Sequence, residues 1–150
     1  MKRSMRKKIK EKGVKIKKRS VSSLKKQAWD LCSEYIRRKY ANPDGLVACV
    51  CCGKFKHWKK RQAGHLVPGR KIGILFDERG IFPCCYGCNI MKGGNIQEYN
   101  AFIDKEFGRE YRLDLVDDLR RKSKEPVKWE STDYENKIIE YQEKLRILPI

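Results

Sequence analysis

Apolar positions recur at the spacing of an α-helix in three parts of the chain. The first stripe predicts a helix from Ser22 or Ser23 to about Tyr40, with a serine hydroxyl capping its first turn. The others predict helices over 89–107, stopped by Gly108, and over 133–147. The three stripes are Leu24, Ala28, Leu31 and Tyr35; Tyr99, Phe102, Ile103 and Phe107; and Ile138, Tyr141 and Leu145. We interpret them as packing faces, although the last helix could instead dimerise.

Shorter patterns complete the predicted fold. Asn42-Pro-Asp-Gly45 predicts a turn after the first helix, because Pro fixes φ and Gly tolerates positive φ. The capping pattern Thr132-x-x-Glu135 marks the start of the last helix. The remaining predicted elements are strands over 62–67 and 81–83 and a short charged helix over 112–122. Two strands followed by the helix from 89 form a small ββα unit, so we expect an α+β fold.

The distribution of charge separates a tail from a single domain. Residues 1–19 contain eleven Lys or Arg and one Glu, and so carry a net charge of +10 out of +17 for the whole chain. Such a segment is expected to be disordered when free. It could solubilise the protein or act as an arm that neutralises nucleic-acid phosphates. We expect one domain over 20–150, with its ββα core at about 45–108 between flanking helices at 22–40 and 132–147.

The net charge of +17 also restricts the class of partner. It favours a polyanion, and nucleic acid is preferred to an anionic membrane. The longest apolar stretch, Leu46 to Cys52, has seven residues and is too short to span a bilayer. The basic start lacks the apolar segment of a signal peptide. We therefore expect a cytoplasmic protein that binds DNA or RNA.

Two C-x-x-C pairs predict a structural zinc site. The proposed ligands are Cys49, Cys52, Cys85 and Cys88. Cys51 and Cys84 adjoin them and leave the register of each pair open, although Gly53 favours a turn after Cys52. Four thiolates close a tetrahedral site. His65, between the pairs, and Asn89, just after the second, therefore remain free for other chemistry.

Five motifs in a fixed order make the chain similar to a known family. They are Cys49-x-x-Cys52-Gly, Gln62-Ala-Gly-His65, Pro68-Gly-Arg70, Phe76-Asp-Glu-Arg79 and Cys85-Tyr-Gly-Cys88-Asn89-x-x-Lys92-x-Gly-Asn95. The chain resembles the NinG (Rap) recombination endonucleases of phages and, more broadly, the HNH or ββα-metal nucleases. The resemblance covers most of residues 20–147. It implies a zinc-stabilised, structure-selective DNA endonuclease that acts on branched recombination intermediates, of the Holliday-junction or D-loop type, in the host cell of a phage or prophage.

The resemblance also implies roles for single residues. His65 matches the general base, and an imidazole that titrates near neutral pH suits proton abstraction from water. Asn89 matches a residue that helps to hold catalytic Mg²⁺ or Mn²⁺. Gly64 and Gly80 replace an acid or His and an Asn of the broad HNH pattern. The candidate replacement ligands are Asp77, ranked first although it could instead pair with Arg79, and Glu78, Asn95 and Glu98.

Basic residues near these motifs are expected to contact DNA phosphates. They are Lys59, Lys60, Arg61, Arg70, Lys71, Arg79 and Lys92. His57, in the first basic stretch, could contact phosphate or belong to a solvated hairpin. A noncatalytic zinc-ribbon accessory protein that binds nucleic acid is the alternative function, and Gly64 is its best support. A homodimer is plausible because a symmetric junction offers two equivalent sites.

Overall fold

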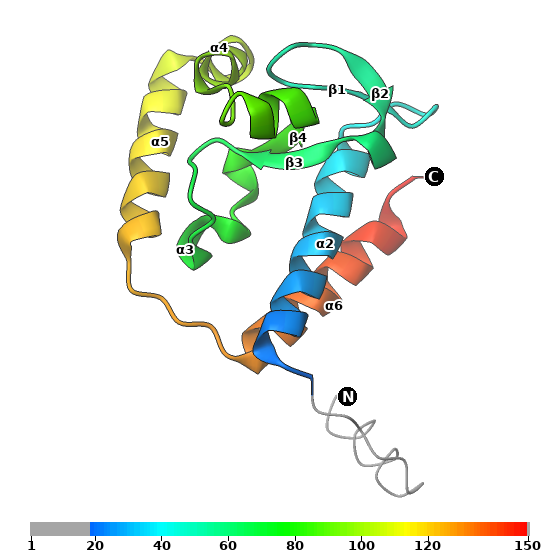
Figure 1. Cartoon of the computed structure of the whole chain (residues 1–150), viewed down its shortest axis with the longest axis vertical. Helices are drawn as coiled ribbons and strands as arrows, with labels where there is room; N and C mark the ends of the chain where they lie inside the picture. Colours follow the sequence, from blue (N-terminus) through cyan, green and yellow to red (C-terminus); the bar gives the residue numbers. More distant parts are fainter. Residues whose placement is uncertain (1–18, 150) are drawn as a thin grey trace, which may run out of the picture.

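A computed structural model describes residues 19–149 (Figure 1). Its elements are α2 (Val21–Lys39), β1 (Leu46–Ala48), β2 (Phe55–His57), β3 (Gln62–His65), α3 (Ile72–Leu75), β4 (Ile81–Cys84), α4 (Ile96–Phe107), α5 (Arg109–Lys124) and α6 (Ser131–Ile147), with 3-10 turns at Trp58–Lys60 and Glu78–Gly80 and a π-helical turn at Gly87–Met91. The described part combines helices with short strands, as predicted. Apart from Arg19, the predicted tail over 1–19 lies outside the described residues.

The first predicted helix is α2, and it begins earlier than expected. The Oγ of Ser20 accepts a hydrogen bond from the backbone N of Ser23 at 3.2 Å. The cap is therefore Ser20 rather than Ser22 or Ser23. The residues that α2 buries are Leu24, Ala28, Cys32 and Ile36. Their spacing of four residues confirms that this face belongs to the core.

The last predicted helix is α6, and its capping pattern is not the expected one. The carboxylate of Asp133 accepts a hydrogen bond from the backbone N of Glu130 at 2.7 Å, so the predicted pair of Thr132 and Glu135 is wrong. The helix lies along α2 and buries Tyr134, Ile138 and Tyr141 (Figure 1). It therefore covers the core of its own chain, as we expected.

The helix predicted over 89–107 is interrupted, and that prediction is wrong at its start. The chain leaves the π-helical turn at Lys92, and Gly93, Gly94 and Asn95 all have positive φ, at 58°, 94° and 46°. Right-handed helix cannot continue through such residues. Helix α4 consequently begins only at Ile96. Its predicted end at Gly108 is confirmed, and α5 starts directly afterwards, three residues earlier than expected.

Both predicted strands are present, and a second hairpin contains His57, as one of the two alternatives for that residue predicted. Strands β3 and β4 pair antiparallel, from Gln62 opposite Cys84 to His65 opposite Ile81. Strands β1 and β2 form a separate antiparallel hairpin before them. The β3–β4 ribbon is followed in the chain by the π-helical turn and α4. This order places the two cysteine pairs at the ends of the two hairpins.

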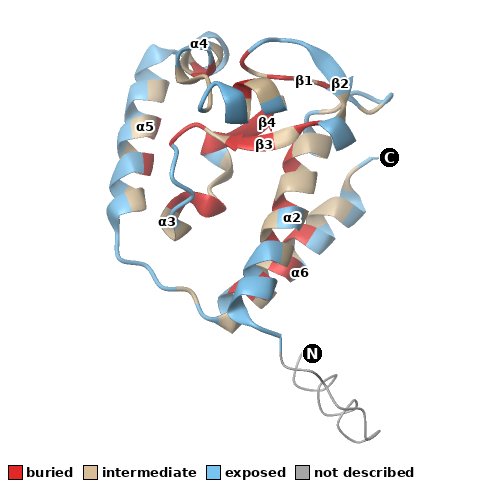
Figure 2. Cartoon of the chain, in the orientation of Figure 1, coloured by how far each residue is buried: buried red, intermediate tan, exposed pale blue. Residues whose placement is uncertain are grey.

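The β3–β4 ribbon separates two clusters of buried side chains. Figure 2 shows that most of the ribbon is itself buried. Alternate residues of a strand point to opposite faces, so Ala63 and Ile81 join the cluster under α2 and α6. Phe82 and Cys84 join the cluster under α4 and α5. This cluster also contains the buried cysteines Cys49, Cys51 and Cys88. Buried side chains on both faces thus hold the ribbon in place. The single domain expected over 20–150 stays a prediction. None of the helices within residues 19–149 is long and apolar enough to cross a membrane.

Candidate metal centre and adjoining cleft

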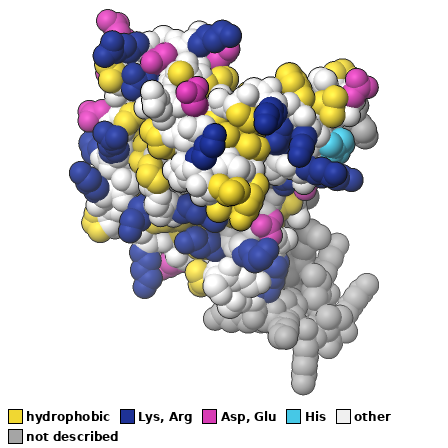
Figure 3. Space-filling view, turned by 45° about the horizontal axis from the view of Figure 1, so that its top comes forward, with side chains coloured by type: hydrophobic (Ala, Val, Ile, Leu, Met, Phe, Trp, Pro, Cys, Tyr) yellow, Lys and Arg dark blue, Asp and Glu magenta, His cyan; other side chains and the backbone are white. Residues whose placement is uncertain are grey.

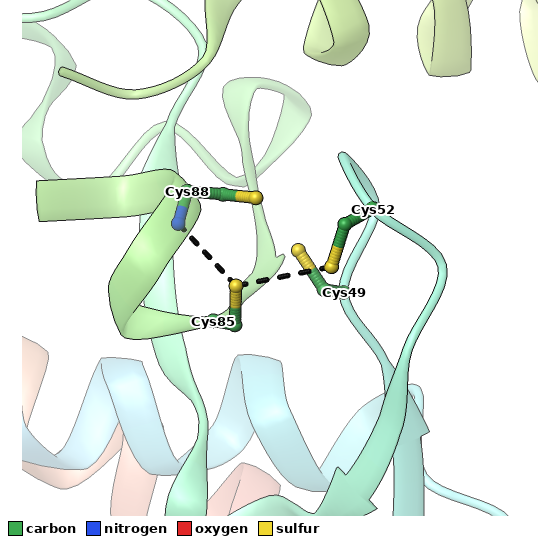
Figure 4. Close-up of side chains that lie close together, drawn as sticks. All are labelled: Cys49, Cys52, Cys85 and Cys88. Atoms are coloured by element: carbon green, nitrogen blue, oxygen red, sulfur yellow. Dashed lines mark hydrogen bonds between the residues drawn. The ribbon is translucent and has the colours of Figure 1, made fainter. Parts of the chain in front are cut away.

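The four cysteines predicted as zinc ligands lie together (Figure 4). The sulfurs of Cys49, Cys52, Cys85 and Cys88 all lie within 4.8 Å of one another. A tetrahedral zinc with Zn–S bonds of about 2.3 Å needs sulfur separations of about 3.8 Å. The Sγ atoms of Cys52 and Cys85 are 3.9 Å apart. The cluster therefore has the composition and the dimensions to hold one zinc ion.

Hydrogen bonds to the sulfurs support the same assignment. The backbone N of Cys88 donates to Cys85 Sγ at 3.3 Å, and Asn95 Nδ2 donates to Cys88 Sγ at 3.5 Å. Such donors orient thiolates around a metal. Cys51 and Cys84 interact with Cys49 but lie outside the group of four, and their thiols donate to the carbonyl oxygens of Gly94 and Phe82. The register that the sequence left open is thus resolved in favour of the predicted four.

A cleft of about 490 Å³ adjoins the cysteine cluster. It is lined by Trp29, Ser33, Arg37, Arg61, Gln62, Ala63, His65, Pro68, Gly69, Arg70, Asn89, Ile90, Gly93, Gly94 and Ile96. Helix α2 forms one wall, β3 forms the floor, and the π-helical turn with the glycines after it forms the other wall. Because Asn89 directly follows the ligand Cys88, the cluster fixes the position of that second wall. The cleft brings together His65 and Asn89, the two residues predicted to be catalytic.

The imidazole of His65 is held in one orientation and one tautomer. Its Nε2 lies 3.1 Å from the carbonyl oxygen of Leu75, which can only accept, so Nε2 carries the proton. The ring stacks on Trp29, with centroids 5.0 Å apart. Burial and the nearby charge of Arg70 lower the pKa of His65, against an opposing contribution from the Leu75 carbonyl. His65 is therefore neutral at pH 7, and Nδ1 makes no hydrogen bond within residues 19–149.

Asn89 is oriented by a residue whose role the sequence did not predict. Its Nδ2 donates to Oε1 of Gln62 at 2.7 Å, which identifies the remaining Asn89 oxygen as a free acceptor. That Oδ1 would lie 3.1 Å from a Cβ built on Gly64. The same Cβ would lie 2.7 Å from Cys84 Sγ, so a side chain at 64 requires Cys84 to shift. Close packing thus accounts for the absence of an acid before His65.

Close packing also accounts for Gly80, which stands where the broad HNH pattern has an Asn. A Cβ at this position would lie 2.6 Å from Cδ1 of Leu119 in α5. The glycine is buried, and its carbonyl oxygen accepts a hydrogen bond from the backbone N of Leu66 at 2.8 Å. An Asn here would have to displace the buried Leu119 side chain.

Three arginines line the cleft, and none of them forms an ion pair with a carboxylate within residues 19–149, although Glu34 and Asp30 act on Arg37 at longer range. Arg37 donates to the carbonyl oxygens of Ser33 and Trp58, and Arg61, only 5% exposed, donates to those of Val47 and Lys54. Arg70 lies over the Trp29 ring, 4.8 Å from its centroid. Carbonyl oxygens satisfy N–H groups but do not neutralise a charge. No Asp or Glu belongs to the lining within the described residues, so the charge of the cleft is suited to an anion.

The acids proposed as ligands of the catalytic metal lie outside the cleft that contains His65. Asp77 accepts two hydrogen bonds from the Arg79 guanidinium, at 3.0 and 2.7 Å, and these keep the pKa of its carboxyl below the usual range. Both residues line a separate hollow next to α5. The alternative of an Asp77–Arg79 pair is thus confirmed, and neither residue joins His65. Glu78 binds Tyr141 and Lys144, and Glu98 is exposed on α4.

The chemistry of the cysteine cluster and of the cleft lining determines which metal ions each can bind. The thiolate cluster fits zinc. Proteins hold Mg²⁺ or Mn²⁺ mainly through carboxylates, and the described lining of the cleft contains none. It offers amide, hydroxyl and carbonyl oxygens, the imidazole of His65 and three guanidinium groups. The described residues of the cleft therefore do not form a protein-held Mg²⁺ or Mn²⁺ site.

The lysines predicted to contact phosphate do not belong to the cleft lining given by the described residues. Lys59, Lys60, Lys71 and Lys92 are exposed, and Figure 3 shows basic side chains spread over the face that it presents. His57 is outside the cleft, where its Nδ1 accepts a hydrogen bond from the backbone N of Lys59. The sequence-based prediction missed Trp29, Arg37 and Gln62. Gln62 lies in the same motif as His65, which was the available signal for it.

Comparisons with known proteins agree with the sequence motifs. The family model described as "NinG: Bacteriophage Lambda NinG protein" matches residues 1–149. The chain is similar to the curated Protein ninG of Salmonella phage P22, with 29% identity over 126 residues, which are 82% of this chain and 56% of the relative. The chain thus spans little more than half the length of that relative. No solved structure matches the chain.

Proposed function

Because this chain belongs to the NinG family of bacteriophage proteins, we propose that it is a DNA endonuclease that hydrolyses phosphodiester bonds in the cleft beside the cysteine cluster. One observation carries the proposal. A half-buried, neutral His65, whose Nδ1 makes no hydrogen bond within residues 19–149, shares a cleft with three arginines that form no ion pair with a carboxylate in that part of the chain. A proton acceptor next to a phosphate-binding wall is the minimum that phosphodiester hydrolysis requires.

His65 acts as the general base in this proposal. Its Nδ1 takes a proton from a water molecule while the water oxygen attacks phosphorus, and the bond from phosphorus to the 3′ oxygen breaks. The 3′ oxygen leaves as a hydroxyl after it receives a proton from solvent, and the 5′ phosphate remains on the other strand end. The Leu75 carbonyl supports this role because it holds the Nε2 proton and favours the imidazolium that forms.

The cleft arginines stabilise the charge that develops on the phosphoryl oxygens. Arg37 and Arg61 are held rigid by carbonyl oxygens, so little side-chain entropy is lost when a phosphate binds. Arg70 is exposed and lies on Trp29, the ring that also stacks on His65. The Trp29 ring therefore sets the spacing between His65, the proposed base, and Arg70, a proposed phosphate contact.

Zinc has a structural role in this account. A closed Cys₄ site has no open position for water or substrate, so zinc fixes the wall that carries Asn89. Asn89 Oδ1, oriented by Gln62, is an acceptor for the attacking water. The order of ribbon, π-helical turn and α4 supports the comparison with ββα-metal nucleases.

Branched recombination DNA is the substrate that the family resemblance supports. A second candidate is a noncatalytic protein that binds nucleic acid through the same cleft. The lack of a carboxylate in the described lining favours this alternative, since it leaves no protein-held catalytic metal.

The two functions are separated by incubating the zinc-loaded chain with end-labelled four-way-junction, D-loop and duplex DNA, with Mg²⁺, with Mn²⁺ and with neither. Cleavage of branched DNA to 5′-phosphate and 3′-hydroxyl ends supports the endonuclease. Stable binding without cleavage of any substrate under all three conditions supports the noncatalytic alternative. Dependence of cleavage on Mg²⁺ or Mn²⁺ would mean that the DNA phosphates supply the missing ligands.

A further inference from the structure

Three large apolar side chains are exposed in one short segment beside the cleft. Tyr86, Ile90 and Met91 are 58%, 54% and 77% exposed. They belong to, or directly precede, the π-helical turn Gly87–Met91, which also contains Cys88 and Asn89. We call these three side chains the apolar turn. Exposed apolar groups gathered at a functional site indicate a surface that contacts a partner.

The apolar turn is held in place by the backbone and by the cysteine cluster. The backbone N atoms of Asn89 and Lys92 donate to the carbonyl oxygens of Cys85 and Gly87, both at 2.9 Å. Two of the four proposed zinc ligands flank Tyr86. The side chains of Ile90 and Met91 therefore project from a preformed support. A partner that contacts them does not have to order the segment first.

The charge around the apolar turn indicates the chemistry of the partner. From Ile81 to Gln97 the sequence contains no Asp or Glu, and Lys92 directly follows Met91. Ile90 itself lines the cleft that contains Arg37, Arg61 and Arg70. Figure 3 shows hydrophobic side chains gathered among basic ones on the face that it presents. A partner with phosphates and flat apolar surfaces fits this arrangement, and nucleic acid has both.

We propose that Ile90 and Met91 insert between bases where the stacking of DNA is interrupted, while the cleft arginines hold the adjoining phosphates. Apolar side chains of this kind wedge into base steps at a cost in unstacking energy. That cost is smallest at a branch point, where stacking is already broken. The apolar turn thereby selects branched DNA over continuous duplex. This inference rests on the DNA binding of the proposed function but not on hydrolysis.

The test compares binding of the full chain to a four-way junction and to a duplex of the same sequence, with His65→Ala present in the binding measurements so that no cleavage occurs; cleavage is measured separately with His65 intact. Ile90→Ala and Met91→Ala are combined in one variant. The matched control is Leu113→Ala, which truncates a side chain 50% exposed on α5. The double variant should lose about tenfold in junction affinity, equivalent to about 1.4 kcal/mol, and little in duplex affinity. Leu113→Ala should change neither.

A fluorescent base gives a second, direct readout. 2-Aminopurine placed at the branch point should become brighter when the protein unstacks it, and the double variant should abolish that change. Met91→Leu should restore the change if apolar bulk is what matters. Equal junction preference and equal fluorescence for the double variant would overturn the inference, as would a parent protein that binds junction and duplex equally. Loss of self-association by the double variant, with junction binding unchanged, would assign the apolar turn to a second copy and also overturn it.

The outcome is separable from that of the proposed function. A double variant with intact cleavage and unchanged junction preference rejects the wedge alone. A parent that never cleaves, but whose junction preference depends on Ile90 and Met91, rejects the nuclease alone.

Discussion

The Nε2 of His65 donates a hydrogen bond to the carbonyl oxygen of Leu75 at 3.1 Å. The donor lies at the end of β3 and the acceptor at the end of α3, so this contact joins the two elements across the loop 66–71 between them. It fixes the imidazole with Nδ1 as its only acceptor. A residue that the sequence marked by its position between two cysteine pairs thereby obtains a defined protonation state.

The pH dependence of cleavage should report this state. Burial and Arg70 hold the pKa of His65 below its ordinary value of 6.5, and a general base works only when deprotonated. We therefore expect kcat/KM to stay constant from pH 8 down to pH 6.5 and to fall at lower pH. Arg70→Gln removes a positive charge that lowers the pKa, so its acid limb should move to higher pH. An acid limb in the parent above pH 6.5 would contradict the assignment.

The zinc assignment predicts different outcomes for neighbouring cysteines. Cys52→Ser removes one of four clustered sulfurs and should abolish zinc binding, unfold the metal centre and eliminate DNA binding. Cys51→Ser is the control, because its side chain points to the Gly94 carbonyl, to which a hydroxyl can also donate. This variant should retain about one zinc per chain. Elemental analysis and circular dichroism measure both, and a folded, zinc-loaded Cys52→Ser protein would refute the ligand set.

Asp77→Asn distinguishes the sequence-based hypothesis from the structure. Asp77 pairs with Arg79 and lines a different hollow from His65, so the substitution should leave the rate of cleavage unchanged. It weakens a partly exposed ion pair and should lower the free energy of unfolding by about 1 kcal/mol or less. Single-turnover cleavage and urea denaturation measure the two effects. A loss of cleavage by a hundredfold or more in a folded protein would restore Asp77 as a metal ligand.

The salt dependence of binding should identify Arg70 as a phosphate contact. Each phosphate contact on duplex DNA contributes about 0.9 to the slope of log K against log salt concentration. Arg70→Ala should reduce the slope by about that amount. Arg146→Ala is the control, because Arg146 pairs with Glu143 on α6, outside the cleft lining. Equal slopes for Arg70→Ala and the parent would exclude a phosphate contact by this residue.

Local patterns predicted much of this fold and the metal ligands. Helices α2 and α6, strands β3 and β4 and the stop at Gly108 follow from spacing and from single residues with special backbone preferences. The four cysteines follow from the two-residue gap within each pair. These features depend on neighbours in the sequence, and the tertiary structure preserves them.

One error overlooked a local signal, and the others concern contacts between distant segments. The apolar stripe after Gly94 led to the prediction of one continuous helix over 89–107. The two consecutive glycines, Gly93 and Gly94, were the visible signal that this helix is broken. The stacking of Trp29 on His65 joins α2 to β3 across 36 positions, and no local pattern indicates it. The same holds for Arg37. Asp77 was ranked by its motif, whereas its place in the fold is set by Arg79 and α5.

The central claim is that His65 is the base for hydrolysis in a cleft that binds DNA phosphate. The most direct test is the single-turnover rate of junction cleavage by the parent and by His65→Ala, at protein concentrations that saturate binding of each. The account predicts equal junction affinity and a loss of at least a hundredfold in rate for His65→Ala. Cleavage by the variant within a few-fold of the parental rate would contradict it.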